Sequence, residues 1–235
     1  MTRFWKTVAV TLALYACVPA AFVQDAETEW RTLSREVKEL HRAGDYSRAL
    51  VVAKKALEVA EKRLGPDHPA VAASLNDLAV LLYSTQGRLG MVMAEALYRR
   101  SLAITEKALG TDHAEVAASL NNLADLYRAR GQYVQAESLN KRALAIREKA
   151  LGPDHPDVGQ SLNNLAGLYY DQGQYVQAEP LYKRSLAIME KAFGPDHPDV
   201  ATNLENMAAL FRKTGREKEA EALEKRAAAI RAIKR

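Results

Sequence analysis

Aspartate and histidine stand side by side at four places in the chain, and together these residue types are able to bind a metal ion or transfer protons. The pairs recur every 42 to 45 residues, and each follows a glycine, as in the stretch Gly-Pro-Asp-His-Pro. Such regular spacing must be explained before any chemistry is assigned to them. The four pairs are Asp67-His68, Asp112-His113, Asp154-His155 and Asp196-His197.

The spacing argues against a shared catalytic or metal site. Successive pairs belong to successive repeats, about 10 Å apart if the repeats are packed helices, whereas a zinc ion needs all its ligands at about 2 Å. We therefore expect each pair to close its loop and cap the helix that follows. The sequence also has no glycine-rich phosphate loop, nucleophile elbow or HExxH motif. We predict that the chain is not an enzyme and has no catalytic residues, cofactor or metal.

The elements that position these pairs are amphipathic helices arranged in repeats. Leu162, Leu165, Ala166 and Tyr169 follow one another at i, i+3, i+4 and i+7, which is the period of an α-helix with one apolar side. Gly173 ends this helix, and a second apolar stripe runs from there to the next Gly-Pro-Asp-His-Pro loop. The same order of residues returns 42 residues earlier and continues downstream. The repeated unit is therefore a helix pair.

A repeat of this length built from two helices predicts an all-α solenoid of about five antiparallel helix pairs. We expect its first helix over residues 25–44 and close helix contacts at small residues such as Ala136 and Ala178. The second unit is three residues longer than the others, and we expect the extra residues to lengthen the turn between Gly87 and Met93. The predicted units are approximately 27–69, 70–113, 114–155, 156–197 and 198–235.

The charge balance excludes an obvious nucleic-acid-binding protein. The chain has 33 basic and 29 acidic residues, a net charge of +4. Arg3 and Lys6 belong to the N-terminal segment discussed next, and without them the net charge falls to +2. A surface that binds nucleic acid usually carries a marked basic stripe. We therefore expect no nucleic-acid partner.

Residues 1–24 have the three-part pattern of a secretory signal peptide. Arg3 and Lys6 precede an apolar run of ten residues, and the small residues Ala20 and Ala21 follow. The run is short beside the roughly 20 residues that span a membrane. We expect an exported protein, periplasmic or secreted. The alternative is a membrane anchor formed by residues 4–23.

The only cysteine, Cys17, lies inside this leader. The stretch from Leu14 to Cys17 resembles a bacterial lipobox, in which the cysteine is lipidated, but Tyr15 is bulkier than that motif prefers. The other interpretation is a cysteine without a role, removed with the leader. The exported chain would then have no thiol for a disulfide or a nucleophile.

The repeat resembles the tetratricopeptide repeat in its 42-residue form, the kind found in kinesin light chain. That signature places a large apolar residue, Leu, a small residue and Tyr on the first helix, Gly at the turn, and Ala, an aromatic and a small residue on the second helix. The light-chain form shows in Leu-Asn-Asn-Leu-Ala and in the Gly-Pro-Asp-His-Pro loop. The resemblance covers essentially everything after the leader and implies a right-handed solenoid. One unit supplies Leu162, Leu165, Ala166, Tyr169, Gly173, Ala178, Tyr182 and Ser185, while the preceding unit has Asn140 at the aromatic place.

The resemblance implies a protein or peptide partner, bound in a concave groove lined by the first helices. In that family the second Asn of Leu-Asn-Asn-Leu-Ala faces the groove, where its amide is able to hydrogen-bond a peptide backbone. A different interpretation is that these asparagines bond neighbouring repeats to each other. Positions three and six residues further on also face the groove in the resemblance. The candidate binding residues are Asp77, Asn122, Asp125, Arg128, Asn164, Tyr170, Asn206 and Arg212.

Two other functions remain open from the sequence. The second hypothesis makes the array a self-associating assembly factor of the cell envelope that uses exposed helix faces or the apolar insert at 87–93. An apolar patch exposed at the insert would favour a homo-oligomer, and a buried one would favour the peptide groove. A third hypothesis makes the protein an accessory subunit of a secreted enzyme, without chemistry of its own.

Overall fold

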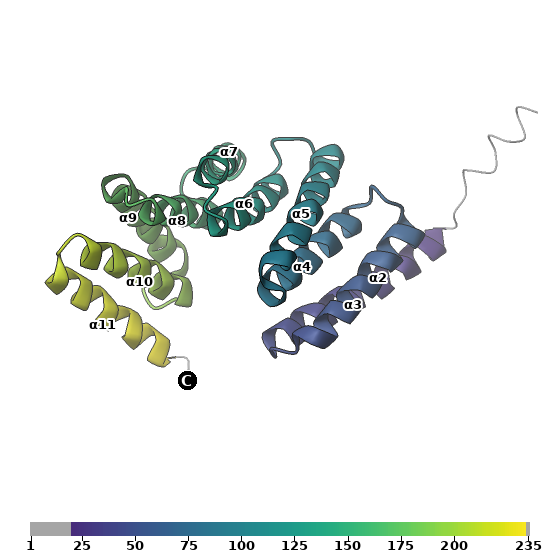
Figure 1. Ribbon diagram of the computed structural model, residues 1–235, viewed down its shortest axis with the longest axis horizontal. Helices are drawn as coiled ribbons and strands as arrows, with labels where there is room; N and C mark the ends of the chain where they lie inside the picture. Colours follow the sequence, from purple (N-terminus) through teal and green to yellow (C-terminus); the bar gives the residue numbers. More distant parts are fainter. Residues whose placement is uncertain (1–19, 234–235) are drawn as a thin grey trace, which may run out of the picture.

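The computed structural model describes residues 20–233, and within this range the chain forms five antiparallel helix pairs stacked into an arch (Figure 1). This confirms the predicted all-α array of helix pairs. Each pair has a first and a second helix in chain order. The pairs are α2 (Ala20–Arg42) with α3 (Tyr46–Val59), which continues into a π-helical turn η2 (Ala60–Leu64); α4 (Pro69–Thr85) with α5 (Gly87–Leu109); α6 (Ala114–Ala129) with α7 (Tyr133–Leu151); α8 (Pro156–Asp171) with α9 (Tyr175–Phe193); and α10 (Pro198–Lys213) with α11 (Glu217–Ile233).

The two helices of the central pairs differ in length and in neighbours. The first helices α6 and α8 have 16 residues each, whereas the second helices α7 and α9 have 19. First helices also contact one another between pairs, as in α2–α4, α6–α8 and α8–α10. In Figure 1, α6 and α8 lie on the inner side of the arch and α7 and α9 on its outer side. The surface of the first helices that faces into the arch is called the concave face below.

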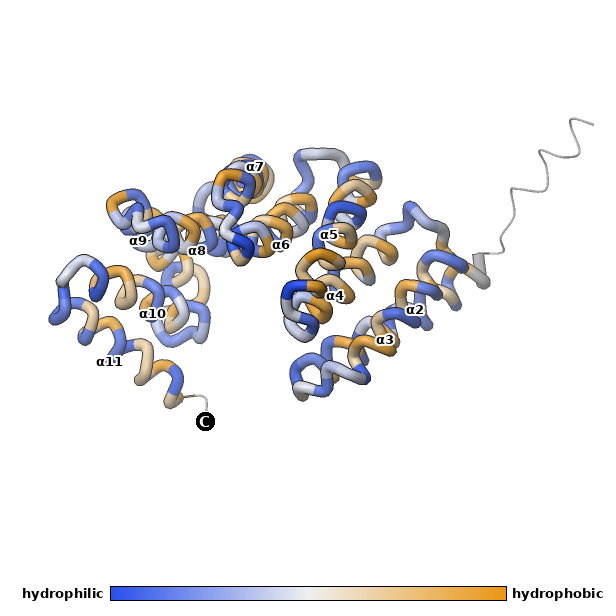
Figure 2. Tube along the Cα trace, in the orientation of Figure 1, coloured by the Kyte–Doolittle hydropathy of each residue, from blue (hydrophilic) through white to orange (hydrophobic). Residues whose placement is uncertain are grey.

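Small residues set the close packing within each pair, as predicted. Ala124 and Ala136 face each other's helices in one pair and Ala166 and Ala178 in the next, and all four are fully buried. Along the helices, apolar residues alternate with polar ones, which Figure 2 shows as orange and blue stretches. Because the side chain at each of these positions is only a methyl group, the two helices of a pair approach closely there.

The Asp-His loops close and cap as predicted, and they define what we call the loop edge of the array. His155 is the N-cap of α8, and its Nδ1 accepts a hydrogen bond of 3.1 Å from the backbone N–H of Asp157. The aspartate before it forms an ion pair with the second helix of the pair that follows the loop, since Lys191 Nζ on α9 lies 2.6 Å from Asp154. The caps recur at His68, His113 and His197, and the ion pairs recur at Lys107–Asp67 and Lys149–Asp112.

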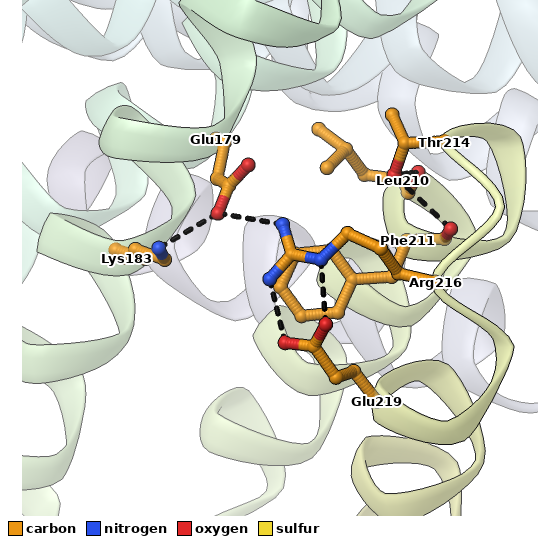
Figure 3. Close-up of polar contacts among 7 residues, drawn as sticks. All are labelled: Glu179, Lys183, Leu210, Phe211, Thr214, Arg216 and Glu219. Carbon is orange, nitrogen blue, oxygen red and sulfur yellow. Dashed lines mark hydrogen bonds and ion pairs between the residues drawn. The ribbon is translucent and has the colours of Figure 1, made fainter.

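A polar contact also joins each unit to the next beside the turns. The Tyr169 hydroxyl donates a 3.0 Å hydrogen bond to Glu137 on the preceding unit. The following unit has Phe211 at this place, and Arg216 supplies the missing donor. Its guanidinium stacks 3.8 Å from the centre of the Phe211 ring and donates to Glu179 at 2.9 Å (Figure 3). The same connection is thus made with different side chains.

The insert of the second unit is helical, and the predicted longer turn is wrong. Only Gln86 separates α4 from α5, which has 23 residues. Three extra residues make almost one helical turn of 3.6 residues, so they lengthen α5 at its start and keep Ala94 facing the core. Gly90 allows the crossing, because a Cβ there would lie 2.1 Å from the Leu82 carbonyl oxygen.

The N-terminal predictions concern residues that are mostly outside the described range. The leader at 1–24 overlaps it only at its end, and Cys17 lies outside it, so both stay predictions. The helix α2 begins at Ala20, five residues before the predicted start, since residues 20–24 contain no glycine or proline to stop it. Among residues 20–233, no helix is long and apolar enough to cross a membrane.

Candidate functional site

The eight predicted binding residues come from four successive first helices. Asp77 belongs to α4, and spacings of three or six residues place the others in a strip along α6, α8 and α10. Asp125 and Arg212 are exposed, and the remaining six are half-buried. The strip therefore lies at the surface of the array, where a partner would reach it.

Two of the three predicted asparagines bond neighbouring repeats to each other. The Asn122 amide donates a 2.6 Å hydrogen bond to the Oδ1 of Asn76, and the Asn206 amide donates one of 3.0 Å to Asn163. The alternative interpretation of these residues is thus confirmed for Asn122 and Asn206. Asn164 makes no side-chain hydrogen bond to any residue between 20 and 233, and it lines a crevice between α8 and α10. It is the asparagine best placed to meet a ligand.

The two arginines of the strip are engaged with carboxylates of the array. Arg128 on α6 forms a 2.5 Å ion pair with Asp171 on α8, and its guanidinium lies against Gly167, where a Cβ would come within 2.9 Å of it. Arg212 donates two hydrogen bonds, of 2.8 and 2.7 Å, to the carboxylate of Glu224. Both cations are neutralised within the array, so they add little net positive charge to the concave face.

The two aspartates of the strip are not neutralised in this way. Within the described residues neither Asp77 nor Asp125 forms an ion pair. The Ser34 hydroxyl donates a long hydrogen bond of 3.4 Å to Asp77, whose pKa is raised by burial. Burial between neighbouring helices also raises the pKa of Asp125 to about 6, and only the Arg128 charge opposes it. Solvent reaches Asp125, but protein on both sides replaces much of its water.

A residue that the sequence did not single out completes this region. Tyr98 comes from the second helix α5, and its ring is only 4% exposed. Burial raises the pKa of its hydroxyl, and so do the nearby Asp125, Tyr83 and Asp77. The hydroxyl makes no hydrogen bond to a residue of the described range. Tyr98 stands at the aromatic position of the repeat, where the next unit has Asn140. This recurring position is the feature of the sequence from which Tyr98 could have been found.

The loop edge has two crevices, and a buried arginine takes the place of a third. One crevice lies between α4 and α6 over Thr105, and the other lies between α8 and α10 over Met189. In α7, the position equivalent to Thr105 and Met189 holds Arg147. This arginine donates hydrogen bonds of 3.0 Å to the Asp157 carbonyl and 2.9 Å to the Ser161 hydroxyl. Burial lowers the pKa of Arg147. Its side chain therefore joins α7 to α8.

Comparison with family models and solved structures places this geometry among known repeats. A tetratricopeptide repeat model matches the sequence at residues 40–91, 90–149, 130–190 and 157–232. No curated protein matches it. Among solved structures, nearly identical TPR-like repeats from a chain described as a kinesin light chain of Podospora anserina share 28% identity, with a TM-score of 0.67, over 87% of this chain and 96% of that one.

Two further structures are similar over most of the chain. BtubC (BKLC) from P. vanneervenii shares 25% identity with a TM-score of 0.68, and 91% of each chain is covered. PilF of Pseudomonas aeruginosa shares 21% identity with a TM-score of 0.61, over 87% of this chain and 78% of that one. The last similarity shows the fold alone.

Proposed function

This chain belongs to the tetratricopeptide repeat family, whose arrays generally act as protein–protein interaction modules, and from that premise we propose that it is a non-catalytic scaffold. Its partner is an extended peptide segment of another protein, bound along the concave face. One observation carries the proposal. Three residues beyond the recurring asparagine the side chain changes from repeat to repeat, although the helices that display it are built alike; the residues there are Val80, Asp125, Gly167 and Ala209.

The available groups fit a peptide backbone and mixed side chains. Asn164 offers both a donor and an acceptor to a backbone amide. Tyr170, whose ring centre lies 5.7 Å from that of Tyr175, offers an aromatic surface. The charges of Arg128 and Arg212 are compensated within the array, so a strongly acidic partner gains little from them. The partner is therefore mostly neutral or basic.

The site of action that we propose is the cell envelope. This rests on the leader at residues 1–24 alone, with its basic start, apolar run and small residues before the first acidic residue. Mass spectrometry of the N-terminus of the protein from envelope fractions tests it. A chain beginning near residue 21 supports cleavage, a lipid on Cys17 supports the lipoprotein alternative, and an intact Met1 contradicts cleavage.

Capture of a partner tests the concave face. The full-length chain is immobilised and exposed to envelope extract beside two variants of equal helicity. The variant Asn164→Ala/Tyr170→Ala removes two concave groups, and the matched control Val134→Ala/Val176→Ala trims exposed outer residues. We expect the partner to be lost with the first variant and retained with the second. Retention by the concave variant and loss by the control would refute the proposed face.

A second candidate function is favoured by the exposed start of α5. Leu89, Val92 and Met93 are 67%, 55% and 45% exposed, which leaves an apolar patch beside the turn. Self-association through this patch would make the array a structural component of an envelope assembly. Sedimentation of the wild type and of Leu89→Ser/Val92→Ser decides it. A dimer that the substitutions dissociate supports this function, and a monomeric wild type excludes it.

A further inference from the structure

The crevice between α8 and α10 has a volume of about 340 Å³ and reaches the concave face at Asn164. Its floor is the buried Met189 of α9, and the half-exposed ring of Phe193 forms part of its wall. Asp157 at the start of α8 and Asp199 at the start of α10 stand at its loop-edge end. One cavity therefore brings together an apolar floor, an aromatic ring and two carboxylates.

The two carboxylates of this crevice have no cationic partner in the part of the chain that the structure describes. His155 Nδ1 lies 3.9 Å from the Asp157 carboxylate, but it accepts the backbone N–H of that aspartate and therefore has no proton to donate. His197 stands in the same relation to Asp199, at 3.6 Å. Among residues 20–233, no lysine or arginine lines the crevice.

Two arginines come close to the crevice, but both are held elsewhere. The guanidinium of Arg147 is bonded to a carbonyl and a hydroxyl of α8. Arg231 reaches the rim at Thr202 and forms an ion pair of 3.0 Å with Glu205. An acidic residue is favoured in the first turn of any helix, so neither carboxylate alone implies a ligand. What distinguishes this step of the array is the open cavity that the two carboxylates share.

One step earlier in the array, an arginine of the chain itself takes the place of this cavity. Arg147 occupies the position that Met189 holds in the next unit, and it donates to the Asp157 carbonyl and the Ser161 hydroxyl. That hydroxyl also accepts a 3.3 Å hydrogen bond from Asn121 of α6, so the guanidinium lies where α6 and α8 meet. The repeat therefore accommodates a guanidinium at this place, and the step from α8 to α10 lacks one of its own.

The deeper polar groups of the open crevice are already satisfied. The Asn203 amide donates a 3.1 Å hydrogen bond to the Asp199 carbonyl and accepts one of 2.7 Å from the Ser185 hydroxyl. A cation that enters therefore finds its acceptors in the carboxylates at the rim. Lysine and arginine join a long apolar stem to a charged head, so the stem suits Met189. A guanidinium also stacks on an aromatic ring such as Phe193 and bonds two acceptors at once.

The distance along α8 also favours a long side chain. Asn164 follows Asp157 by seven residues, which is about 10 Å of helix. A peptide backbone that Asn164 holds on the concave face therefore needs a long side chain to reach the carboxylates. A metal ion fits less well, because no group of three potential metal ligands occurs among the described residues.

We propose that the crevice between α8 and α10 binds one arginine or lysine side chain of the partner peptide, with its stem over Met189 and its charged head between Asp157 and Asp199. This inference rests on the proposed function of the concave face and adds the chemistry and position of one recognised residue. Arginine is preferred to lysine, because its planar fork reaches both carboxylates.

Peptide pools with one fixed residue test the inference. Nine-residue peptides of random uncharged sequence carry Arg, Lys, Gln or Glu at the centre, and their retention on the immobilised full-length chain is measured. We expect the Arg pool to be retained about tenfold better than the Gln pool, the usual loss when a charged hydrogen bond is removed, with the Lys pool between them. The crevice variant Asp157→Asn/Asp199→Asn should abolish this preference.

Filling the crevice from within provides a second test. Met189→Arg places a guanidinium of the chain itself where Arg147 lies one unit earlier, and it should abolish the preference for the Arg pool. Thr105→Arg makes the matched change in the crevice between α4 and α6 and should leave that preference unchanged. Circular dichroism establishes that both variants are helical before the pools are compared. If Met189→Arg does not fold, the crevice variant decides alone.

The control and the contrary outcomes separate this inference from the proposed function. Asp67→Asn/Asp112→Asn removes the same charge from two distant loops and should leave the preference unchanged. Equal retention of the Arg and Gln pools, or a preference that survives in the crevice variant, would overturn the inference. If equally retained pools were nevertheless lost with Asn164→Ala/Tyr170→Ala, the concave face would stand as a binding site without a crevice for a basic residue. Retention of no pool at all would count against both.

Discussion

The loop edge and the concave face are built by the same repeats, yet they differ in how much the repeats vary. At the loop edge each described unit boundary has the same histidine cap, and the aspartate–lysine pair recurs at 2.5 or 2.6 Å. On the concave face, equivalent positions hold Val80, Asp125, Gly167 and Ala209. Contacts within the scaffold repeat where the same loop closes the same helix pair. Residues that recognise a partner are free to differ, and here they do.

The two regions also treat their carboxylates in opposite ways. The Asp112 carboxylate accepts a hydrogen bond from Lys149, which lowers its pKa. The pKa of Asp125 is raised to about 6, because it is partly buried without a cation of its own. A satisfied carboxylate stabilises the fold, whereas an unsatisfied one leaves interaction energy for a ligand. This difference separates the scaffold from the candidate site.

The largest expected effect is on stability and comes from the interior that both regions share. Ala178→Leu forces a larger side chain between α8 and α9 and should lower the free energy of unfolding by about 1–3 kcal/mol. Ala209→Leu makes the same change on the half-buried concave face and should cost much less. Thermal unfolding followed by circular dichroism measures both. Equal losses would show that the concave face is as tightly constrained as the interior.

A smaller loss is expected at the loop edge. His155→Ala removes the acceptor for the Asp157 N–H and should destabilise the array by about 1 kcal/mol, the usual cost of an N-cap. His155→Asn keeps a capping acceptor and should recover most of that loss. Urea unfolding of the two variants makes the comparison. A full loss with Asn would mean that the imidazole acts through packing and not through the cap.

The smallest expected effect is on the pH dependence of stability, which compares the carboxylates of Asp125 and Asp112. A raised pKa means that the folded state binds the proton more tightly, so ionised Asp125 disfavours folding above about pH 6 and this penalty fades toward pH 4. Asp125→Asn should therefore be more stable than wild type at pH 7.5 and lose that advantage at pH 4. Because solvent reaches the side chain, the gain should stay well below about 1 kcal/mol.

Asp112→Asn provides the control with the opposite sign. Its lowered pKa gives stability that is present above the ordinary aspartate pKa and is lost as the pH falls through the folded value. The variant should be less stable than wild type at pH 7.5 and match it in acid. Melting temperatures at several pH values measure both differences. If both variants shifted in the same direction, the contrast between the two regions would be wrong.

The sequence predicted what the repeats have in common. The helix pairs, the interior alanines Ala136 and Ala178, and the capping histidines all recur at a fixed spacing, so one physical explanation covers each set. The insert was misjudged because three extra residues look like a longer loop. Only the packing of Ala94 shows that they add a turn of helix.

The candidate site was less accessible from the sequence because it depends on contacts between repeats. Asn122 and Asn206 face neighbours that lie more than 40 residues away in the chain, and nothing local distinguishes a bonded amide from a free one. Tyr98 sits on the apolar side of its helix and is expected in the core.

We propose that a partner binds on the concave face, and covalent capture of that partner is the sharpest test. A photoreactive benzoylphenylalanine replaces Tyr170 on the concave face of the full-length chain, or the 81% exposed Val134 on α7. Both proteins are irradiated in envelope extract, and their covalent adducts are compared. We expect a discrete adduct from position 170 and none from position 134. An adduct from position 134 alone would place the partner on the outer side and contradict it.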